Sequence, residues 1–254
     1  MLQALLFDVD GTLADTERDG HRVAFNLAFA EAGLEWEWSV DLYGELLAVT
    51  GGKERIRYYL EHFNRDFTPP ADLDDFIAGL HKAKTAHYTA LLAEGRIPLR
   101  SGVARLLREA REAGLRLAIA TTTTPANVEA LLTHTLGADS IGWFEVIAAG
   151  DVVPAKKPAP DIYQYALQQM ALPADACLAF EDSINGIRSS LGAGLQTVIT
   201  VNDYTREDDF SHAALVLDHL GEAEIPCRVL AGDERILNGT PYLDIETLKR
   251  LHAG

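Results

Sequence analysis

Residues 5–16 read LLFDVDGTLADT and place two carboxylates at the end of a short apolar run. A short apolar run that is closed by a glycine is typical of a buried strand. Residues two apart on a strand point to the same side, so Asp8 and Asp10 face the same space. Two carboxylates this close repel each other unless a cation or a proton lies between them. The stretch therefore predicts a buried strand that ends in a functional site.

The composition of the chain predicts an acidic globular protein. The 254 residues are 48% hydrophobic, which is enough for one large or two smaller domains. The chain has 22 Lys and Arg against 38 Asp and Glu, and its formal charge of −16 disfavours nucleic acid and anionic membranes as partners. Cys177 and Cys227 are too few for a disulfide framework or a zinc site. Because we find no signal-type or membrane-length apolar run, we expect a cytoplasmic protein.

The segment 17–92 has the spacing of helices, with no convincing strand. Apolar residues recur at helical intervals, and glycines or prolines separate the helical segments. The expected helices span about 21–33, 40–49, 53–63 and 73–94. We therefore expect residues 17–92 to form a small helical domain that is inserted after the first strand, between two parts of a larger domain at 1–16 and 93–254.

From Pro98 onward, apolar runs alternate with helical segments. The expected strands span about 115–120, 144–148, 176–180 and 197–201, and the tail after Gly221 is ambiguous except for a helix at 244–251. Strands that alternate with helices imply right-handed crossovers and a mostly parallel sheet with helices on both faces. The sequence therefore predicts an α/β fold.

Acidic residues follow two of the expected strands. In parallel sheets, ligands bind beyond the carboxyl ends of the strands, where Asp8 and Asp10 would meet Glu181 and Asp182. The carboxylates of Asp8 and Asp182 and the backbone carbonyl of Asp10 form an oxygen set that suits Mg²⁺. Glu181 would bind the metal through water or support the ligands. Alternatively, Glu181 and Asp182 cap the helix that follows them.

Two further segments offer groups that bind anions. The hydroxyl of Thr121 and the backbone N–H of Thr122 precede a helix that Pro125 opens, a place where anions bind. Lys157 precedes a proline, so its backbone is biased to extended conformations and its amine can reach a cleft. The alternatives are a capping run of threonines and a solvated loop lysine, and we expect Lys156 to be solvated.

Together these groups fit a site for phosphoryl transfer. Asp8 would attack phosphorus and form an aspartyl phosphate. Asp10 would protonate the leaving oxygen and then take a proton from the hydrolytic water. Mg²⁺, Lys157 and the threonine donors would neutralise the three equatorial oxygens. The expected substrate is thus a small phosphorylated molecule.

The same residues resemble the four motifs of the haloacid dehalogenase superfamily. These motifs are FDVDGT at 7–12, Thr121, KP at 157–158 and ED at 181–182. The resemblance implies a Rossmann-like core, an inserted helical cap and dependence on Mg²⁺. It also implies these roles: nucleophile, Asp8; acid and base, Asp10; phosphate binding, Thr121 and Lys157; metal binding, Asp8, Asp10 and Asp182. The namesake dehalogenases lack the second aspartate and need no metal, so Asp10 favours a phosphatase or phosphomutase.

Within the superfamily, four segments resemble the CbbY-like branch. They are KPAPD at 157–161, EDS at 181–183, DTE at 15–17 with His21, and TGGKER at 50–55. This resemblance implies a phosphatase that removes xylulose-1,5-bisphosphate, an inhibitor of Rubisco. A phosphomutase of the beta-phosphoglucomutase type is the alternative, although such mutases place a linker histidine one residue before His21. A regulatory binding protein without enzymatic activity is a third, remote alternative.

The helical insertion carries candidates for binding the rest of a bisphosphate. A second phosphate needs its own cations, and the turn at Gly52, Lys53 and Arg55 lies near a helix start, with Lys84 on the last long helix of the insertion. Glu17 and His21 follow the first strand closely and are expected to meet sugar hydroxyls. The alternative is that the basic residues are ordinary solvated charges and that the histidine serves packing.

Overall fold

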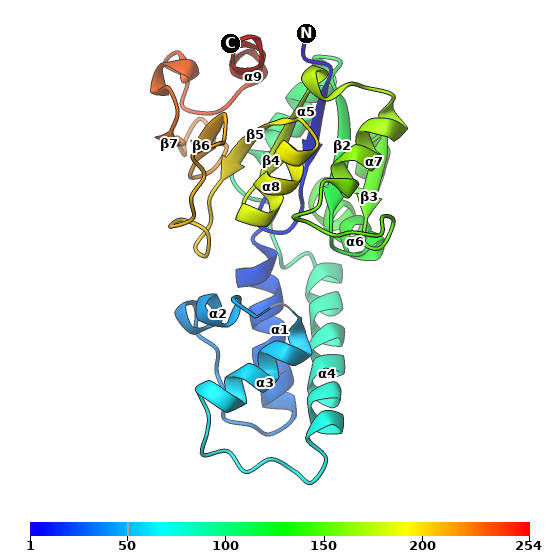
Figure 1. Cartoon of the computed structure of the whole chain (residues 1–254), viewed down its shortest axis with the longest axis vertical. Helices are drawn as coiled ribbons and strands as arrows, with labels where there is room; N and C mark the ends of the chain where they lie inside the picture. The colour runs from blue at the N-terminus through cyan, green and yellow to red at the C-terminus, as the bar shows by residue number, and fades with distance from the viewer. Residues whose placement is uncertain (50) are drawn as a thin grey trace. The chain divides into compact units, whose positions relative to one another are not determined.

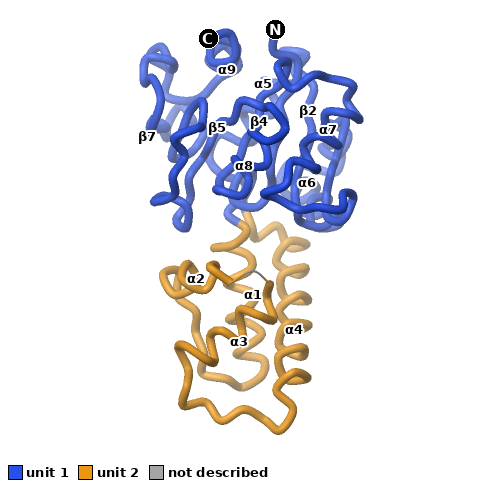
Figure 2. Tube along the Cα trace, viewed as in Figure 1, with its two compact units in different colours: residues 1–15, 98–254 blue, residues 16–97 orange. Residues whose placement is uncertain are grey.

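The computed structural model describes residues 1–49 and 51–254 and divides into two compact units. Unit 1 consists of Met1–Asp15 and Pro98–Gly254, and unit 2 consists of Thr16–Ile97 (Figure 2). Thr50, which belongs to the predicted TGGKER loop, lies outside the described residues. In the part of the chain that is described, no helix is both long and apolar enough to cross a membrane.

Unit 1 is built on a seven-stranded sheet in its described residues, with the order β3-β2-β1-β4-β5-β6-β7 (Figure 1). The strands are β1 Ala4–Phe7, β2 Arg116–Thr121, β3 Val146–Ala149, β4 Cys177–Glu181, β5 Gln196–Thr200, β6 Leu215–Leu217 and β7 Val229–Ala231. All neighbours pair in parallel except β6 and β7, which are antiparallel. This confirms the predicted α/β fold with a mostly parallel, Rossmann-like sheet.

The strand β1 lies in the interior of the sheet, away from both edge strands, because its whole length is apolar. All four residues of Ala4–Phe7 are buried, and the strand pairs with β2 on one side and β4 on the other. Helices cover both faces of such a strand, so both sets of alternating side chains must be apolar. On β4, Phe180 stacks on Phe7 with ring centroids 4.4 Å apart. This interior position carries the residues after Phe7 to the edge where ligands bind.

Helices of unit 1 cover both faces of the sheet. In Figure 1, α7 and α8 lie in front of the sheet and α5 lies behind it. Alanines on alternate positions of the sheet, including Ala118, Ala120 and Ala179, let α7 approach closely. The helices are α5 Val103–Glu112, α6 Pro125–Leu136, α7 Asp161–Met170, α8 Ile184–Gly192 and α9 Ile245–Ala253, with 3₁₀ turns η2 Ala138–Trp143, η3 Ala174–Ala176 and η4 Glu234–Leu237.

Two strands of unit 1 have no counterpart among the predicted elements. Both β6 and β7 are three residues long, which is too short for a period of two to show. The β7 segment lies in the tail whose sequence is ambiguous. The tail thus extends the sheet at one edge, and α9 confirms the terminal helix expected at 244–251.

Unit 2 is helical and packs around aromatic side chains. It begins with one π-helical turn, η1 Thr16–His21, followed by α1 Arg22–Glu31, α2 Val40–Leu46, α3 Gly52–His62 and α4 Leu73–Ala93. Trp38 is fully buried, with its ring centroid 4.6 Å from that of Phe25 and 4.9 Å from that of Phe29. Aromatic pairs of this kind stabilise a small core beyond their buried area. The four expected helices are present, whereas the π-helical turn has no sequence signal.

Candidate active site

The first predicted acid, Asp8, continues β1 into a tight turn. Its backbone N–H donates to Phe180 O at 3.0 Å, which extends the pairing of β1 with β4 by one residue. The chain then turns at Gly11, where φ is +86° and a residue with a side chain would be strained. A Cβ atom at Gly11 would also lie 2.0 Å from Asp182 Oδ2. The glycine therefore lets the Asp8 loop fold directly against the end of β4.

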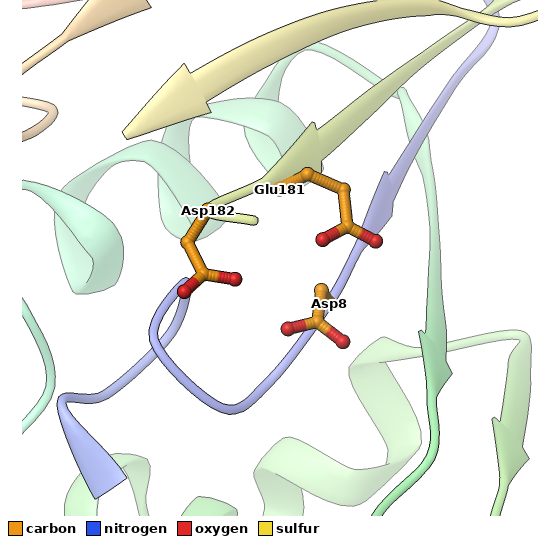
Figure 3. A group of neighbouring side chains, drawn as sticks. All are labelled: Asp8, Glu181 and Asp182. Atoms are coloured by element: carbon orange, nitrogen blue, oxygen red, sulfur yellow. The ribbon is translucent and has the colours of Figure 1, made fainter. Parts of the chain in front are cut away.

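Three buried carboxyl groups meet at the ends of β1 and β4. One oxygen from each of Asp8, Glu181 and Asp182 lies within 4.8 Å of the others, and Figure 3 shows the three side chains facing one shared space. Burial raises the pKa of Asp182 well above its usual value, and the charges of Asp8 and Glu181 raise it further. Burial likewise raises the pKa of Glu181, with Asp8 adding to the effect. The three carboxyl groups therefore need positive charge close by if they are to be ionised together.

The donor set of this cluster fits a hard divalent cation. Carboxylate oxygens are the ligands that Mg²⁺ and similar cations prefer. Glu181 Oε2 is buried and has no hydrogen-bond partner in the described residues, although an unpaired buried carboxylate oxygen is costly. Asp10 is half-buried, and its carboxylate is outside this three-acid group. The structure thus brings together two of the predicted metal ligands, Asp8 and Asp182, with Glu181.

Lys157 lies inside the acid cluster. Its Nζ donates to Asp8 Oδ1 and to Glu181 Oε1, both at 2.6 Å, and its side chain is 7% exposed. Burial alone would lower the pKa of the ammonium group, but the charges and hydrogen bonds of the two acids outweigh it and raise the pKa. The group is therefore held in its charged form. By contrast, Lys156 is exposed and pairs with Asp151 at 2.8 Å.

The four threonines at the end of β2 differ in burial and in role. Thr121 is fully buried, and its Oγ1 accepts a hydrogen bond from Thr123 N at 3.3 Å. Thr122 is exposed. Thr124 caps α6 by accepting from the backbone N–H of Asn127. Since Thr124 performs the capping, the alternative of a plain capping run does not explain Thr121 and Thr122.

Three residues that the sequence analysis did not single out touch the acid cluster or the ends of neighbouring strands. Tyr163 Oη donates to Glu181 Oε1 at 2.5 Å, and Asn202 Nδ2 donates to Asp182 Oδ2 at 2.7 Å. Arg100 is buried and donates to backbone carbonyls at the ends of β5 and β6. Asn202 follows the end of β5, so the rule that selected the other strand ends would also have selected it. Tyr163 lies inside a helix and has no such signal.

In unit 2, two of the predicted binding residues lie beside a lysine of the last helix. Lys84 Nζ lies 2.9 Å from His21 Nδ1, and the ring of His21 stacks on Tyr88 with centroids 3.9 Å apart. Burial opposes ionisation of Glu17, yet its pKa is lowered, and the positive charges of Arg55 and Lys84 are among the causes. Glu17 Oε2 accepts a hydrogen bond from Tyr43 Oη at 2.6 Å. The three predicted residues therefore form one polar cluster.

The remaining candidates in unit 2 differ in exposure. Arg55 is buried, and its guanidinium donates to Tyr43 Oη at 2.7 Å and to the carbonyls of Leu46 and Val49. Lys53 lies at the start of α3 and is exposed. Gly52 precedes it, and a Cβ there would lie 2.6 Å from the ring of His81. Arg55 thus supports the position of Tyr43, whereas Lys53 is accessible to a ligand.

The titration of His21 gives a test of the cluster in unit 2. Partial burial lowers the pKa of His21 to about 4, with Lys84 adding to the effect and Glu17 opposing it. The unfolded chain binds this proton at about pH 6.5, so lowering the pH from about 6.5 to about 4 favours unfolding. The free energy of unfolding should fall in this window with a slope of up to about 1.4 kcal/mol per pH unit.

The variant His21→Asn keeps a hydrogen-bond acceptor for Lys84 but does not titrate. We expect denaturant unfolding of this variant to show a flatter pH dependence between about pH 4 and 6.5 than the unsubstituted chain. The control substitution is His212→Asn, at an exposed histidine of unit 1 that lies outside this cluster. Equal slopes for His21→Asn and the unsubstituted chain would show that His21 is not held neutral.

Comparison with known proteins gives the family of the chain. Residues 2–194 match the model of the haloacid dehalogenase-like hydrolases. The chain belongs to this family. Protein CbbY from Cupriavidus necator is 50% identical over 225 residues, which cover 89% of this chain and 88% of that protein. The predicted resemblance to the superfamily and to its CbbY-like branch is therefore confirmed.

Solved structures agree with this assignment. A crystal structure of CbbY from Rhodobacter sphaeroides in complex with phosphate has 50% sequence identity and a TM-score of 0.72, and the match covers 86% of this chain and 95% of that one. A mutant of the same protein, in complex with xylulose-1,5-bisphosphate, has 49% identity with the same TM-score and coverage. This haloacid dehalogenase-like protein is thus a phosphoric monoester hydrolase that acts on sugar phosphates.

Proposed function

We propose that this chain is a magnesium-dependent phosphatase that hydrolyses xylulose-1,5-bisphosphate in the cytoplasm and so removes an inhibitor of Rubisco. The observation that carries the proposal is the buried ammonium group of Lys157, which bridges Asp8 and Glu181 beside Asp182. The complexes of the Rhodobacter sphaeroides CbbY with phosphate and with xylulose-1,5-bisphosphate support the choice of substrate. In this proposal, residues 1–16 and 93–254 are the catalytic core and residues 17–92 are the cap.

The proposed metal site uses the carboxylates of Asp8 and Asp182 and the backbone carbonyl of Asp10. The Oε2 atom of Glu181, which has no hydrogen-bond partner among the described residues, and the raised pKa of Asp182 support a cation in this cluster. When bound there, Mg²⁺ would supply positive charge that stabilises the oxygens of the phosphoryl group. Glu181 would support the site from beside it, because its Oε1 already accepts from Lys157 and Tyr163.

In the proposed reaction, the side chains of the core perform two displacements at phosphorus. A carboxylate oxygen of Asp8 forms a bond to phosphorus while the bond to the sugar oxygen breaks, and Asp10 gives its proton to that oxygen. Asp10 then accepts a proton from a water molecule that attacks the aspartyl phosphate, which releases inorganic phosphate and restores Asp8. Lys157 stays charged beside Asp8, where it neutralises the phosphoryl oxygens together with Thr121 and Thr122.

The proposal is tested by measuring the products formed from a panel of sugar phosphates. The panel contains xylulose-1,5-bisphosphate, ribulose-1,5-bisphosphate and beta-glucose-1-phosphate, each with Mg²⁺ and with EDTA. We expect phosphate release to be fastest from xylulose-1,5-bisphosphate and to stop in EDTA. Conversion of beta-glucose-1-phosphate into its 6-phosphate isomer without phosphate release would instead show a phosphomutase. Unchanged rates of phosphate release in EDTA would show that the reaction does not depend on Mg²⁺.

A substitution of Lys53 tests the proposed contact with the second phosphate. Its exposed ammonium group lies on the first turn of α3, so Lys53→Ala should remove one charged hydrogen bond to a bisphosphate. We expect KM for the bisphosphate to rise roughly tenfold, since such a bond is worth about 1.5 kcal/mol. Hydrolysis of a small aryl phosphate should not change.

The matched control for Lys53 is Lys82→Ala, which removes another exposed lysine from unit 2. It should leave KM for both substrates unchanged. Equal effects of Lys53→Ala on the bisphosphate and on the aryl phosphate would remove Lys53 from the site for the second phosphate. Arg55 is less suited to this test, because its substitution would also release Tyr43.

A further inference from the structure

Asp182 is fixed from outside the acid cluster by a residue that no motif includes. Asn202 Nδ2 donates to Asp182 Oδ2 at 2.7 Å. Asn202 comes from a different strand, two residues beyond the last residue of β5, and β5 pairs directly with β4. The contact therefore joins two neighbouring strand ends of unit 1.

The orientation of the Asn202 amide is set by the turn in which it lies. Its Oδ1 accepts a hydrogen bond from the backbone N–H of Tyr204 at 2.9 Å, and its own backbone N–H donates to Thr205 Oγ1 at 3.1 Å. Because the amide oxygen receives a backbone N–H, the amide nitrogen is the atom that faces Asp182. A flipped side-chain amide would lose the bond from Tyr204 N and the bond to Asp182, so the donor toward Asp182 is held in place.

The strand before Asn202 is held by Arg100. The buried guanidinium of Arg100 donates to the backbone carbonyls of Thr200 at 2.9 Å and Val201 at 2.5 Å, and also to the carbonyl of Gly11. It pairs with Asp15, with Nε 3.3 Å from Oδ1. Backbone carbonyls that accept hydrogen bonds from one buried side chain move little relative to one another. Both neighbours of the Asp182 carboxylate, the Gly11 turn and the Asn202 turn, are therefore tied to one side chain.

One oxygen of Asp182 is enclosed and the other faces the cluster. The missing Cβ of Gly11 would lie 2.0 Å from Asp182 Oδ2 and 2.8 Å from Asn202 Nδ2, so Oδ2 lies between these two residues. Figure 3 shows an oxygen of Asp182 directed into the space that it shares with Asp8 and Glu181. Repulsion from those acids would turn an untethered carboxylate away, and the amide of Asn202 opposes that rotation.

We propose that Asn202 is a positioning residue that holds Asp182 for metal binding, an inference that rests on the proposed magnesium site. A carboxylate that is already aimed into the cluster loses less freedom when a cation binds. Residues that orient metal ligands in this way contribute roughly 10- to 100-fold in metal affinity. Asn202 acts on the metal through Asp182 and takes no part in the transfer of the phosphoryl group.

Two substitutions distinguish the effect of the amide donor of Asn202 from the effect of the turn in which it lies. Asn202→Ala removes the amide and its bond to Tyr204 N, whereas Asn202→Ser keeps a side-chain oxygen for that backbone N–H but lacks a donor long enough to reach Asp182. We expect both variants to bind Mg²⁺ roughly 10-fold more weakly or worse by calorimetry without substrate. At saturating Mg²⁺, KM for the sugar phosphate should be unchanged. Asn64→Ala, in unit 2, is the control and should bind Mg²⁺ normally.

The outcomes separate this inference from the proposed function. If the unsubstituted chain binds no Mg²⁺ and releases no phosphate, the proposed function fails. If the unsubstituted chain binds Mg²⁺ and both Asn202 variants bind it within about twofold of the same affinity, the positioning role is wrong. Normal binding by Asn202→Ser with weak binding by Asn202→Ala would assign the effect to the turn, which also contradicts the role of the amide.

Discussion

Asp8→Asn should reduce phosphate release from sugar phosphates to below about one per cent of that of the unsubstituted chain. The amide keeps the volume of the carboxyl group but cannot attack phosphorus. The neighbours should stay in place, because Lys157 retains its bond to Glu181 at 2.6 Å and one of three mutually repelling acids loses its charge. The loss is measured as steady-state phosphate release with saturating Mg²⁺.

The control for Asp8 is an aspartate that also pairs with a lysine but lies at the surface. Asp151 is exposed and bound to Lys156, so Asp151→Asn should leave the rate unchanged. A folded Asp8→Asn variant that keeps more than about one per cent of the rate would show that Asp8 is not the nucleophile. A thermal unfolding curve close to that of the unsubstituted chain establishes that the variant is folded.

Lys157→Met is expected to have the second largest effect, on both catalysis and stability. Removing one positive donor at the phosphoryl oxygens should lower kcat by roughly 100- to 1,000-fold. The buried acids Asp8 and Glu181 would also lose their only described lysine partner. Breaking a buried ion pair by removing one partner costs about 3 to 5 kcal/mol, and we expect a loss of this order in the free energy of unfolding without Mg²⁺.

The neighbouring lysine provides a matched control for this prediction. Lys156 differs in being exposed, and its pair with Asp151 lies at the surface, where water screens such pairs and they contribute little to stability. Lys156→Met should therefore change neither kcat nor the free energy of unfolding by a large amount. Similar denaturant midpoints for the two variants would contradict the account of Lys157 as the charge that holds the acid cluster together.

The sequence predicts the core of this protein well because the core follows a simple rule. A continuous apolar run such as 4–7 must lie inside a sheet, and the residue after it must emerge at the edge where ligands bind. Asp8, Thr121 and Asp182 follow that rule, and all three are buried at the ends of neighbouring strands. The alternation of strands and helices then predicts the α/β class.

Other features depend on contacts that sequence spacing does not encode. Tyr163 reaches Glu181 from the middle of a helix, where its position is that of an ordinary core residue. Arg55 has the pattern of a solvated helix charge, yet it is buried against Tyr43 and two backbone carbonyls. The strands β6 and β7 are too short for a periodic signal. Each of these requires the three-dimensional arrangement of distant segments.

The central claim is that the sugar phosphate is hydrolysed through an aspartyl phosphate on Asp8. The stereochemistry at phosphorus tests this claim most directly. The substrate is xylulose-1,5-bisphosphate whose transferred phosphorus is made chiral with sulfur and oxygen isotopes, and hydrolysis takes place in isotope-labelled water. Each displacement inverts the configuration, so attack by Asp8 followed by attack of water predicts inorganic thiophosphate with retained configuration. Inverted thiophosphate would show that water attacks the substrate directly, and the role of Asp8 as the nucleophile would be wrong.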